Sequence, residues 1–181
     1  MQILEIECVD LASLCYHNKE RYPFLLESVN HNENNRYSIL FAFPGKKIIL
    51  NEFSDFDFLS KLESQVQLDK ENTNLPFAGG WFVYLSYELI GQIEPILADN
   101  LHTSQLPIAC AIEIPCAIIT DHQSGTFQII DQDNNHDRID MVLKDIEALS
   151  PIPTQPFSGK LSQENEDKFI KGVNSSKDYI I

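Results

Sequence analysis

The chain is poor in basic residues, which excludes several classes of partner. It has 13 Lys and Arg against 27 Asp and Glu, a formal net charge of −14. A surface with this balance repels phosphate backbones and anionic lipid headgroups. We therefore expect neither a nucleic-acid partner nor a membrane partner, and we interpret most carboxylates as a solvated surface.

Long apolar runs and a leader segment are also missing. The apolar runs are too short to span a bilayer, and the N-terminal MQILEIECVD has no basic segment, apolar core segment or small-residue cleavage site. We therefore expect a cytoplasmic protein. The Asn-Ser-Ser at 174–176 matches a glycosylation acceptor, but it needs a secretory context and is interpreted as a false positive.

The sequence patterns of common catalytic and metal sites are absent. Gly-Lys pairs at 45–46 and 159–160 lack the rest of a phosphate-binding loop, and there is no HExxH, GxSxG or EF-hand pattern. The cysteines lack zinc-ligand spacing and are expected to be buried apolar thiols. The histidines are scattered and are expected to be solvated, with one of them lining a site as the alternative. These residues are Cys8, Cys15, Cys110 and Cys116, and His17, His31, His102, His122 and His136.

What is present is enough for one sizeable domain, since 181 residues can bury an ordinary core. The alternation in ILEIECV (3–9) predicts a half-buried strand, and Asp10 is a candidate N-cap for a short helix through Leu11, Leu14 and Cys15. PFLLES (23–28) and RYSILFAF (36–43) predict two more strands around the polar turn NHNENN (30–35). KKIIL (46–50) is expected to be a hairpin partner after the turn at Pro44-Gly45.

Later segments alternate between helical and extended patterns. DFDFLSKLESQVQL (55–68) predicts a helix with Phe58, Leu62 and Val66 on one face and Asp55 near its start. ACAIEIPCAIITDHQSGTFQIID (109–131) predicts two strands hinged at 123–125. Residues 136–149 predict an amphipathic helix whose apolar stripe is Ile139, Val142, Leu143 and Ile146.

A Pro-rich segment then divides the chain. SPIPTQPFSGK (150–160) can continue neither a helix nor a central strand, so we interpret it as a linker after a domain of residues 1–149. Residues 161–181 predict a final helix with Ser162 as its N-cap and Phe169, Val173 and Ile180 on one apolar face.

Two motifs in a fixed order carry a family resemblance. The first is Leu25-Leu26-Glu27-Ser28, and the second is LPFAGGWFVYLSYELIGQIEP, with Pro76, Phe77, Gly79, Gly80, Tyr84, Tyr87 and Glu88 at the matching positions. Together they resemble the N-terminal domain of anthranilate synthase component I and para-aminobenzoate (aminodeoxychorismate) synthase component I. Val83 stands where the general pattern has a glycine, and the segment looks more like the aminobenzoate branch.

The resemblance implies an α+β fold of antiparallel β-sheets packed with helices, and a pocket for free tryptophan or a similar amino acid at Leu26, Glu27 and Ser28. In such a pocket the Glu27 carboxylate would pair with the ligand ammonium, and the Ser28 hydroxyl would bond to its carboxylate. The alternative is that Glu27 and Ser28 begin a turn. Arg36 matches a basic position of the family, and the alternative for it is a surface ion pair with an acid.

The second motif is interpreted mainly as framework. Its paired glycines permit a close backbone approach, and its aromatic residues are expected to cover both faces of a central, buried strand. The alternative is ligand contact. The aromatic residues concerned are Trp81, Phe82, Tyr84 and Tyr87.

The resemblance also implies that residues 161–181 are the first helix of a chorismate-binding domain, so we interpret the chain as an N-terminal fragment. Chorismate is a dianion that needs clustered cationic donors, and the only arginines here are Arg21, Arg36 and Arg138. We therefore expect no catalytic residue and no cofactor within this chain. The full-length enzyme would use magnesium, chorismate and ammonia from a glutaminase subunit, component II. The alternatives are anthranilate synthase component I with a feedback site, or a stand-alone amino-acid-binding module.

Overall fold

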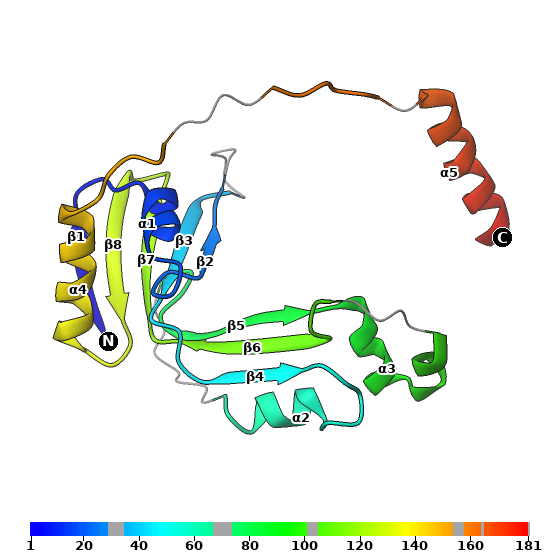
Figure 1. Ribbon diagram of the computed structural model, residues 1–181, viewed down its shortest axis with the longest axis horizontal. Coiled ribbons are helices and arrows are strands. Elements are labelled where there is room, and N and C mark those ends of the chain that lie inside the picture. The colour runs from blue at the N-terminus through cyan, green and yellow to red at the C-terminus, as the bar shows by residue number, and fades with distance from the viewer. Residues whose placement is uncertain (29–34, 67–73, 101–104, 154–157, 164, 181) are drawn as a thin grey trace.

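The structure of the protein is a computed structural model that describes residues 1–28, 35–66, 74–100, 105–153, 158–163 and 165–180, with the backbone alone at 98–100 (Figure 1). Helices and antiparallel strands build an α+β fold, which confirms the predicted fold class. Two sheets dominate it, and they are called sheet A and sheet B below.

Sheet A has five strands in the order β1-β8-β7-β3-β2, and every neighbouring pair is antiparallel. The strands are β1 (Gln2–Ile6), β2 (Phe24–Leu26), β3 (Tyr37–Ala42), β7 (Cys116–Asp121) and β8 (Thr126–Asp131). The three strands predicted before residue 44 are therefore present, although β1 and β2 are shorter than their apolar patterns. The predicted turn at 30–35 lies outside the described residues except for Asn35.

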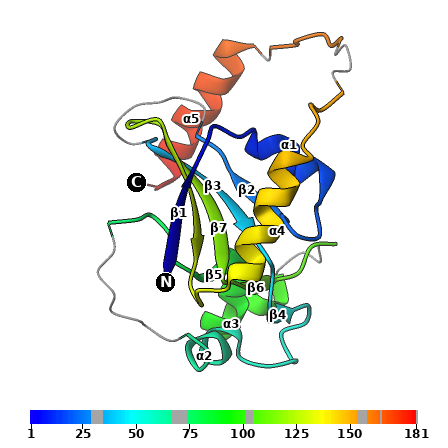
Figure 2. The same ribbon diagram turned by 90° about the vertical axis from the view of Figure 1, so that its left-hand side faces the viewer.

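Two helices cover one face of sheet A, as Figure 2 shows. They are α1 (Leu11–His17) and α4 (His136–Glu147), and both were predicted. The Asp10 carboxylate accepts a hydrogen bond from the Ala12 N–H at 3.0 Å, so the predicted N-cap is confirmed. Leu14 from α1 and Val142 from α4 are buried against Leu40 and Ile118 of the sheet. This packing is the main core of the molecule.

Sheet B has three strands in the order β4-β6-β5, with β4 (Lys47–Leu50), β5 (Gly80–Leu85) and β6 (Ala109–Ile114). The prediction that 46–50 forms a hairpin with the preceding strand is wrong, because β4 pairs with β6. At Phe43 the backbone has φ 56°, and this left-handed residue turns the chain out of sheet A before β4 begins. A second core lies under sheet B, where Leu50 and Ala109 pack with Phe58 of α2 (Phe58–Glu63).

The segment 109–131 forms three strands rather than the two predicted. Pro115 separates β6 from β7, since proline has no N–H to continue a ladder, and the chain crosses there from sheet B to sheet A. The second half of the prediction is confirmed, because β7 and β8 pair in the register Asp121↔Thr126 around the turn that contains 123–125.

The prediction of a central, buried strand in the second motif is also wrong. β5 is an edge strand that pairs with β6 alone, so Val83 and Leu85 are 41% and 50% exposed. Tyr87 lies beyond the strand in a short helix, η1 (Tyr87–Leu89), and is 79% exposed. Two further short helices follow, α3 (Ile90–Ile93) and η2 (Pro95–Asn100).

Of the paired glycines, Gly79 serves close packing, but against a side chain, whereas a Cβ at Gly80 would make only an ordinary contact with Phe77 at 3.8 Å. Gly79 has φ +107°, and a Cβ added there would lie 2.0 Å from Oε1 of Gln132, which follows β8. Any other residue at 79 would meet both a strained backbone and this clash. The glycine thus lets the start of β5 approach the end of β8.

Two helices begin or end at other residues than predicted. α2 ends at Glu63, so Val66 lies outside it, and its N-cap is Asp57, whose carboxylate accepts from the Ser60 N–H at 2.8 Å. The last helix, α5 (Glu166–Ile180), begins later than the predicted cap at Ser162, and the Asn165 side chain accepts from the Asp167 N–H at 2.8 Å. None of the described side chains of α5 is buried. The described residues between α4 and α5 form no helix or strand, as expected of a linker.

Candidate functional site

The predicted pocket residues lie where an edge strand ends. In β2, Leu25 faces the core under α1, whereas Phe24 and Leu26 face the opposite side of sheet A. Leu26 pairs with Ile39 of β3 and is 52% exposed. Glu27, which follows it, is exposed as well. The described chain therefore presents these two side chains to solvent and does not enclose them.

Ser28 is tied back to β3 by two hydrogen bonds. Its N–H donates to the Ser38 Oγ at 3.0 Å, and its hydroxyl donates to the Tyr37 carbonyl at 2.7 Å. Because a hydroxyl has one hydrogen, Ser28 cannot also donate to a ligand carboxylate unless it rotates away from Tyr37. In the present geometry its free lone pair accepts instead, which suits a ligand ammonium.

Ser38 and His122 join this site, and sequence reasoning missed both. Ser38 is 3% exposed, and its Oγ lies 2.8 Å from Nε2 of His122, which follows β7. Ser38 could have been identified as a candidate site residue because it is a polar residue at a core-facing position of the apolar run RYSILFAF. The expectation that histidines are solvated is confirmed for the exposed His17 and His136, whereas His122 is half-buried and lies against Ser38; His31 and His102 lie outside the described residues.

Arg36 lies at the same end of sheet A and is held by Asp121. Its Nε and Nη2 donate to the two carboxylate oxygens of Asp121 at 2.9 and 2.6 Å, and its guanidinium lies 4.8 Å from the centre of the Tyr37 ring. The Arg36 hydrogen bonds hold the pKa of the Asp121 carboxyl below its usual range. The structure thus has the ion pair that was the alternative for Arg36.

Leu26 lies on an apolar surface of sheet A that no described helix covers. We call it the open face of sheet A, and it is opposite the side covered by α1 and α4. Its centre at Ala117, Ile119 and Ile130 is buried, partly beneath Leu75 and Phe77. Its margins are exposed, with Ile3 at 46% and Leu26 at 52%.

Aromatic rings connect this site to sheet B. Phe24 of β2 stacks on Phe82 of β5 with ring centroids 3.9 Å apart and an interplanar angle of 3°. Phe41 meets the same Phe82 ring at 5.5 Å. The two sheet edges that carry the two sequence motifs therefore touch each other next to Leu26.

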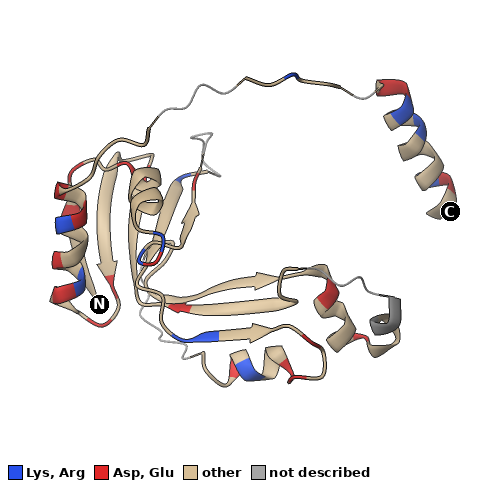
Figure 3. Cartoon of the chain, viewed as in Figure 1, with Lys and Arg blue, Asp and Glu red and all other residues tan. Residues whose placement is uncertain are grey.

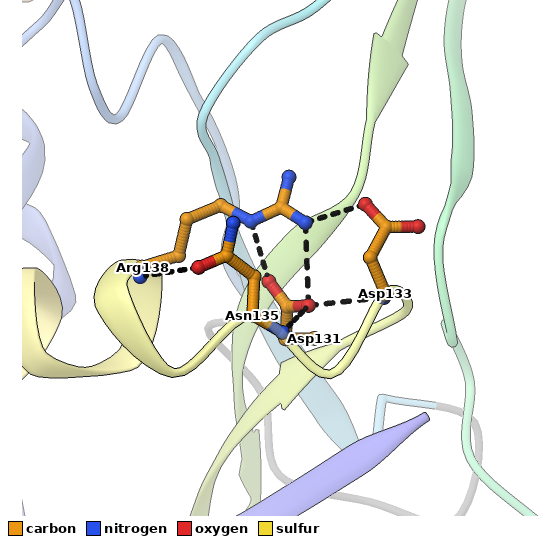
Figure 4. A network of polar contacts seen from close by, with 4 residues as sticks. All are labelled: Asp131, Asp133, Asn135 and Arg138. Atoms are coloured by element: carbon orange, nitrogen blue, oxygen red, sulfur yellow. Dashed lines mark hydrogen bonds and ion pairs between the residues drawn. The ribbon is translucent and has the colours of Figure 1, made fainter.

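A second polar cluster, drawn in Figure 4, lies between β8 and α4. The Asp131 side chain is fully buried, and its Oδ1 accepts from the N–H groups of Asp133 and Asn135 at 3.0 and 2.9 Å. Arg138 forms ion pairs with Asp131, at 2.8 Å, and with Asp133. These contacts close the turn and seat the first turn of α4, so we assign the cluster to structure rather than to chemistry.

The cysteine thiols and the potential metal ligands offer little further chemistry. Cys116 is buried as predicted, and burial raises its pKa to about 12, but Cys8 is exposed, so the prediction of four buried thiols is wrong. Within the described segments, no group of three His, Cys, Asp or Glu side chains is placed to hold a metal ion. Nor does any helix of those segments have the length and apolar character to cross a bilayer.

No family model matches the chain, and no curated protein matches it either. The resemblance to the chorismate-utilising enzymes therefore rests on the residues of the two motifs and on their order.

Proposed function

We propose that this chain is the N-terminal domain of an aminodeoxychorismate synthase component I, the enzyme that aminates chorismate to 4-amino-4-deoxychorismate for para-aminobenzoate and folate synthesis. The observation that carries the proposal is the ordered pair of motifs at 25–28 and 75–95. The stack of Phe24, which directly precedes the first motif, on Phe82 of the second supports it, since the two motifs then lie in one local structure. A cytoplasmic location belongs to the same proposal.

In this proposal the domain binds an amino acid of the tryptophan type and does not convert chorismate. Leu26 supplies an exposed apolar surface, the Glu27 carboxylate is available to pair with an ammonium, and Ser28 Oγ has a lone pair to accept from it. Leu26 is at the open face of sheet A, and Glu27 and Ser28 follow it directly at the end of β2. The ligand carboxylate would need a donor from elsewhere, or a rotated Ser28 hydroxyl.

The pairing of the arginines supports a non-catalytic role. Arg21 is bound to Asp145, Arg36 to Asp121 and Arg138 to Asp131. A dianion such as chorismate would have to displace these carboxylates to gain a guanidinium partner. Acidic residues are dispersed over both sheets and their helices, as Figure 3 shows, which further disfavours an anionic substrate at this domain. In the proposed enzyme, chorismate and magnesium belong to the chorismate-binding domain, and the glutaminase subunit is a partner of the full-length chain.

The test is to supply the complete gene product with chorismate, magnesium and ammonium and to identify the product by chromatography. Aminodeoxychorismate is the expected product. Anthranilate, formed with sensitivity to tryptophan, would assign the chain to anthranilate synthase component I instead. The absence of any product would favour the stand-alone amino-acid-binding module.

The site residues are tested separately by calorimetric titration of the same protein with tryptophan. Glu27→Gln is expected to weaken binding about tenfold, because a charge-assisted hydrogen bond to the ammonium is lost. The exposed Glu20→Gln is the matched control and should leave the affinity unchanged. Equal affinities of Glu27→Gln and Glu20→Gln would remove Glu27 from the site.

A further inference from the structure

The end of β2 raises the question of what fixes Glu27 and Ser28 in place. β2 has three residues and lies at the edge of sheet A, and such strand ends open readily. Beyond Leu26, the Ser28 N–H donates to the side chain of Ser38 and not to a backbone carbonyl of β3. Besides the bond from the Ser28 hydroxyl to the Tyr37 carbonyl, the position of this segment thus depends on the direction of the Ser38 hydroxyl.

The Ser38 hydroxyl is fixed from two sides. It accepts from the Ser28 N–H at 3.0 Å and lies 2.8 Å from His122 Nε2. With the oxygen already accepting from Ser28, its one hydrogen is available to donate to an unprotonated Nε2. Ser38 is also 3% exposed, so water does not compete well for these contacts.

His122 is in turn placed by the pairing of β3 with β7. Its backbone N–H donates to the Arg36 carbonyl at 2.8 Å, and Asp121 beside it holds the Arg36 guanidinium through two hydrogen bonds. Three strand ends therefore meet at Ser38: β2 through Ser28, β3 through Ser38 itself and β7 through His122.

We infer that Ser38, oriented by His122, is the positioning residue that holds Ser28, and with it Glu27, against the end of β3 for ligand binding. Ser38 acts through Ser28 and does not itself touch the ligand. The effect on the ligand rests on the proposed function, whereas the effect on the Ser28 backbone does not.

Thr120 offers a matched control for Ser38. It is directly opposite Ser38 in the β3–β7 register and is 5% exposed. Its Oγ1 has no hydrogen-bond partner within the described part of the chain. Ser38→Ala and Thr120→Val thus remove neighbouring buried hydroxyls, of which only the Ser38 hydroxyl holds another strand.

The first experiment measures amide hydrogen exchange at Ser28 by NMR in the free protein. Ser38→Ala is expected to speed exchange there about tenfold, the equivalent of one lost hydrogen bond, while Thr120→Val leaves it unchanged. Ser38→Thr, which keeps the hydroxyl, should restore protection. Unchanged exchange at Ser28 in Ser38→Ala would overturn the inference. If Ser38→Ala does not fold, which a loss of protection at the amides of Ile118 and Ile129 would reveal, His122→Ala replaces it with the same expected direction and the same contrary outcome.

The second experiment titrates the complete gene product and its variants with tryptophan. Ser38→Ala should weaken binding about fivefold to tenfold, Thr120→Val should bind as the unaltered protein does, and Ser38→Thr should recover most of the affinity. If the unaltered protein binds tryptophan and Ser38→Ala binds equally well, the inference about the ligand fails. If the unaltered protein does not bind tryptophan, the proposed pocket fails, while the exchange data still decide the role of Ser38.

Discussion

Each arginine of the chain lies against a carboxylate, but the three pairs differ in burial. The Arg138 partner Asp131 is fully buried, whereas in the Arg36–Asp121 pair the arginine side chain is 42% exposed. Exposed pairs are screened by water and contribute little to stability, and buried pairs are costly to break. At the scale of single residues, the loss of stability on removing a charge therefore depends on how deeply its ion pair is buried.

The Arg36–Asp121 pair predicts a dependence of stability on pH. Because the pKa of Asp121 is lowered in the folded state, its ionised form stabilises the fold above the ordinary aspartate pKa of about 4, and this contribution is lost as pH falls further. Urea unfolding of the protein and of Asp121→Asn between pH 7 and pH 2 should show a gap in unfolding free energy that is constant near neutrality and shrinks in acid. A gap as large at pH 2 as at pH 7 would contradict the prediction, and Glu20→Gln serves as the control.

The chain passes from one sheet to the other at two residues. Phe43, with its left-handed backbone, and Pro115, without an N–H, each end a strand of one sheet just before a strand of the other begins. The connection from β8 to α4 is a third element boundary. There the Asp131 carboxylate, and not a neighbouring strand, accepts the hydrogen bonds of the Asp133 and Asn135 N–H groups. The element boundaries thus coincide with side chains that satisfy or remove backbone groups.

The β8–α4 connection predicts that Asp131→Asn destabilises the protein far more than Asp133→Asn. Asp131→Asn leaves the Arg138 guanidinium without its buried counter-charge, with an expected loss of about 3 kcal/mol in unfolding free energy. Asp133→Asn should lower the unfolding free energy by less than about 1 kcal/mol, because the Asp133 side chain is 56% exposed. Chemical denaturation of both variants measures the two losses, and similar values would refute a structural role for the buried carboxylate.

At the scale of the whole molecule, sheet A with α1 and α4 and sheet B with α2 each have their own core, and the aromatic stack joins them. α5 belongs to neither core. Its apolar side chains remain outside, with Phe169 at 71% and Val173 at 43% exposed. A helix of this length receives little stability from its own hydrogen bonds. To be stable, α5 therefore needs to pack its apolar face against another surface, and its exposed side chains make no such contact here.

This arrangement predicts that α5 contributes nothing measurable to the stability of the two sheets. Phe169→Ala should change the free energy of unfolding by less than about 0.5 kcal/mol, because the side chain loses no buried contact. Ile139→Ala in α4, a residue 4% exposed, should cost about 2 to 5 kcal/mol. Thermal unfolding followed by circular dichroism compares the variants, and a clear loss for Phe169→Ala would show that α5 packs on the domain.

The candidate site could be predicted only in part. Leu26, Glu27 and Ser28 form one contiguous segment, so a motif finds them together. Ser38 and His122 are 84 residues apart and meet through the β3–β7 pairing, which no local pattern encodes. The role of the Ser28 hydroxyl also depended on the structure, since its bond to the Tyr37 carbonyl decides which of its atoms remain available.

The sequence by itself determined the elements that depend on neighbours a few residues away: the cap at Asp10, the helix through Ile139 and Val142, and the alternating strand β1. Their physical basis is local, in side-chain periodicity and in hydrogen bonds across a single turn. The tertiary structure alone decided that β4 pairs with β6, that β5 lies at an edge and that Ser38 meets His122. Strand pairing depends on which apolar faces of distant segments are buried together. The choice among the alternative pairings is therefore made only when the whole chain folds.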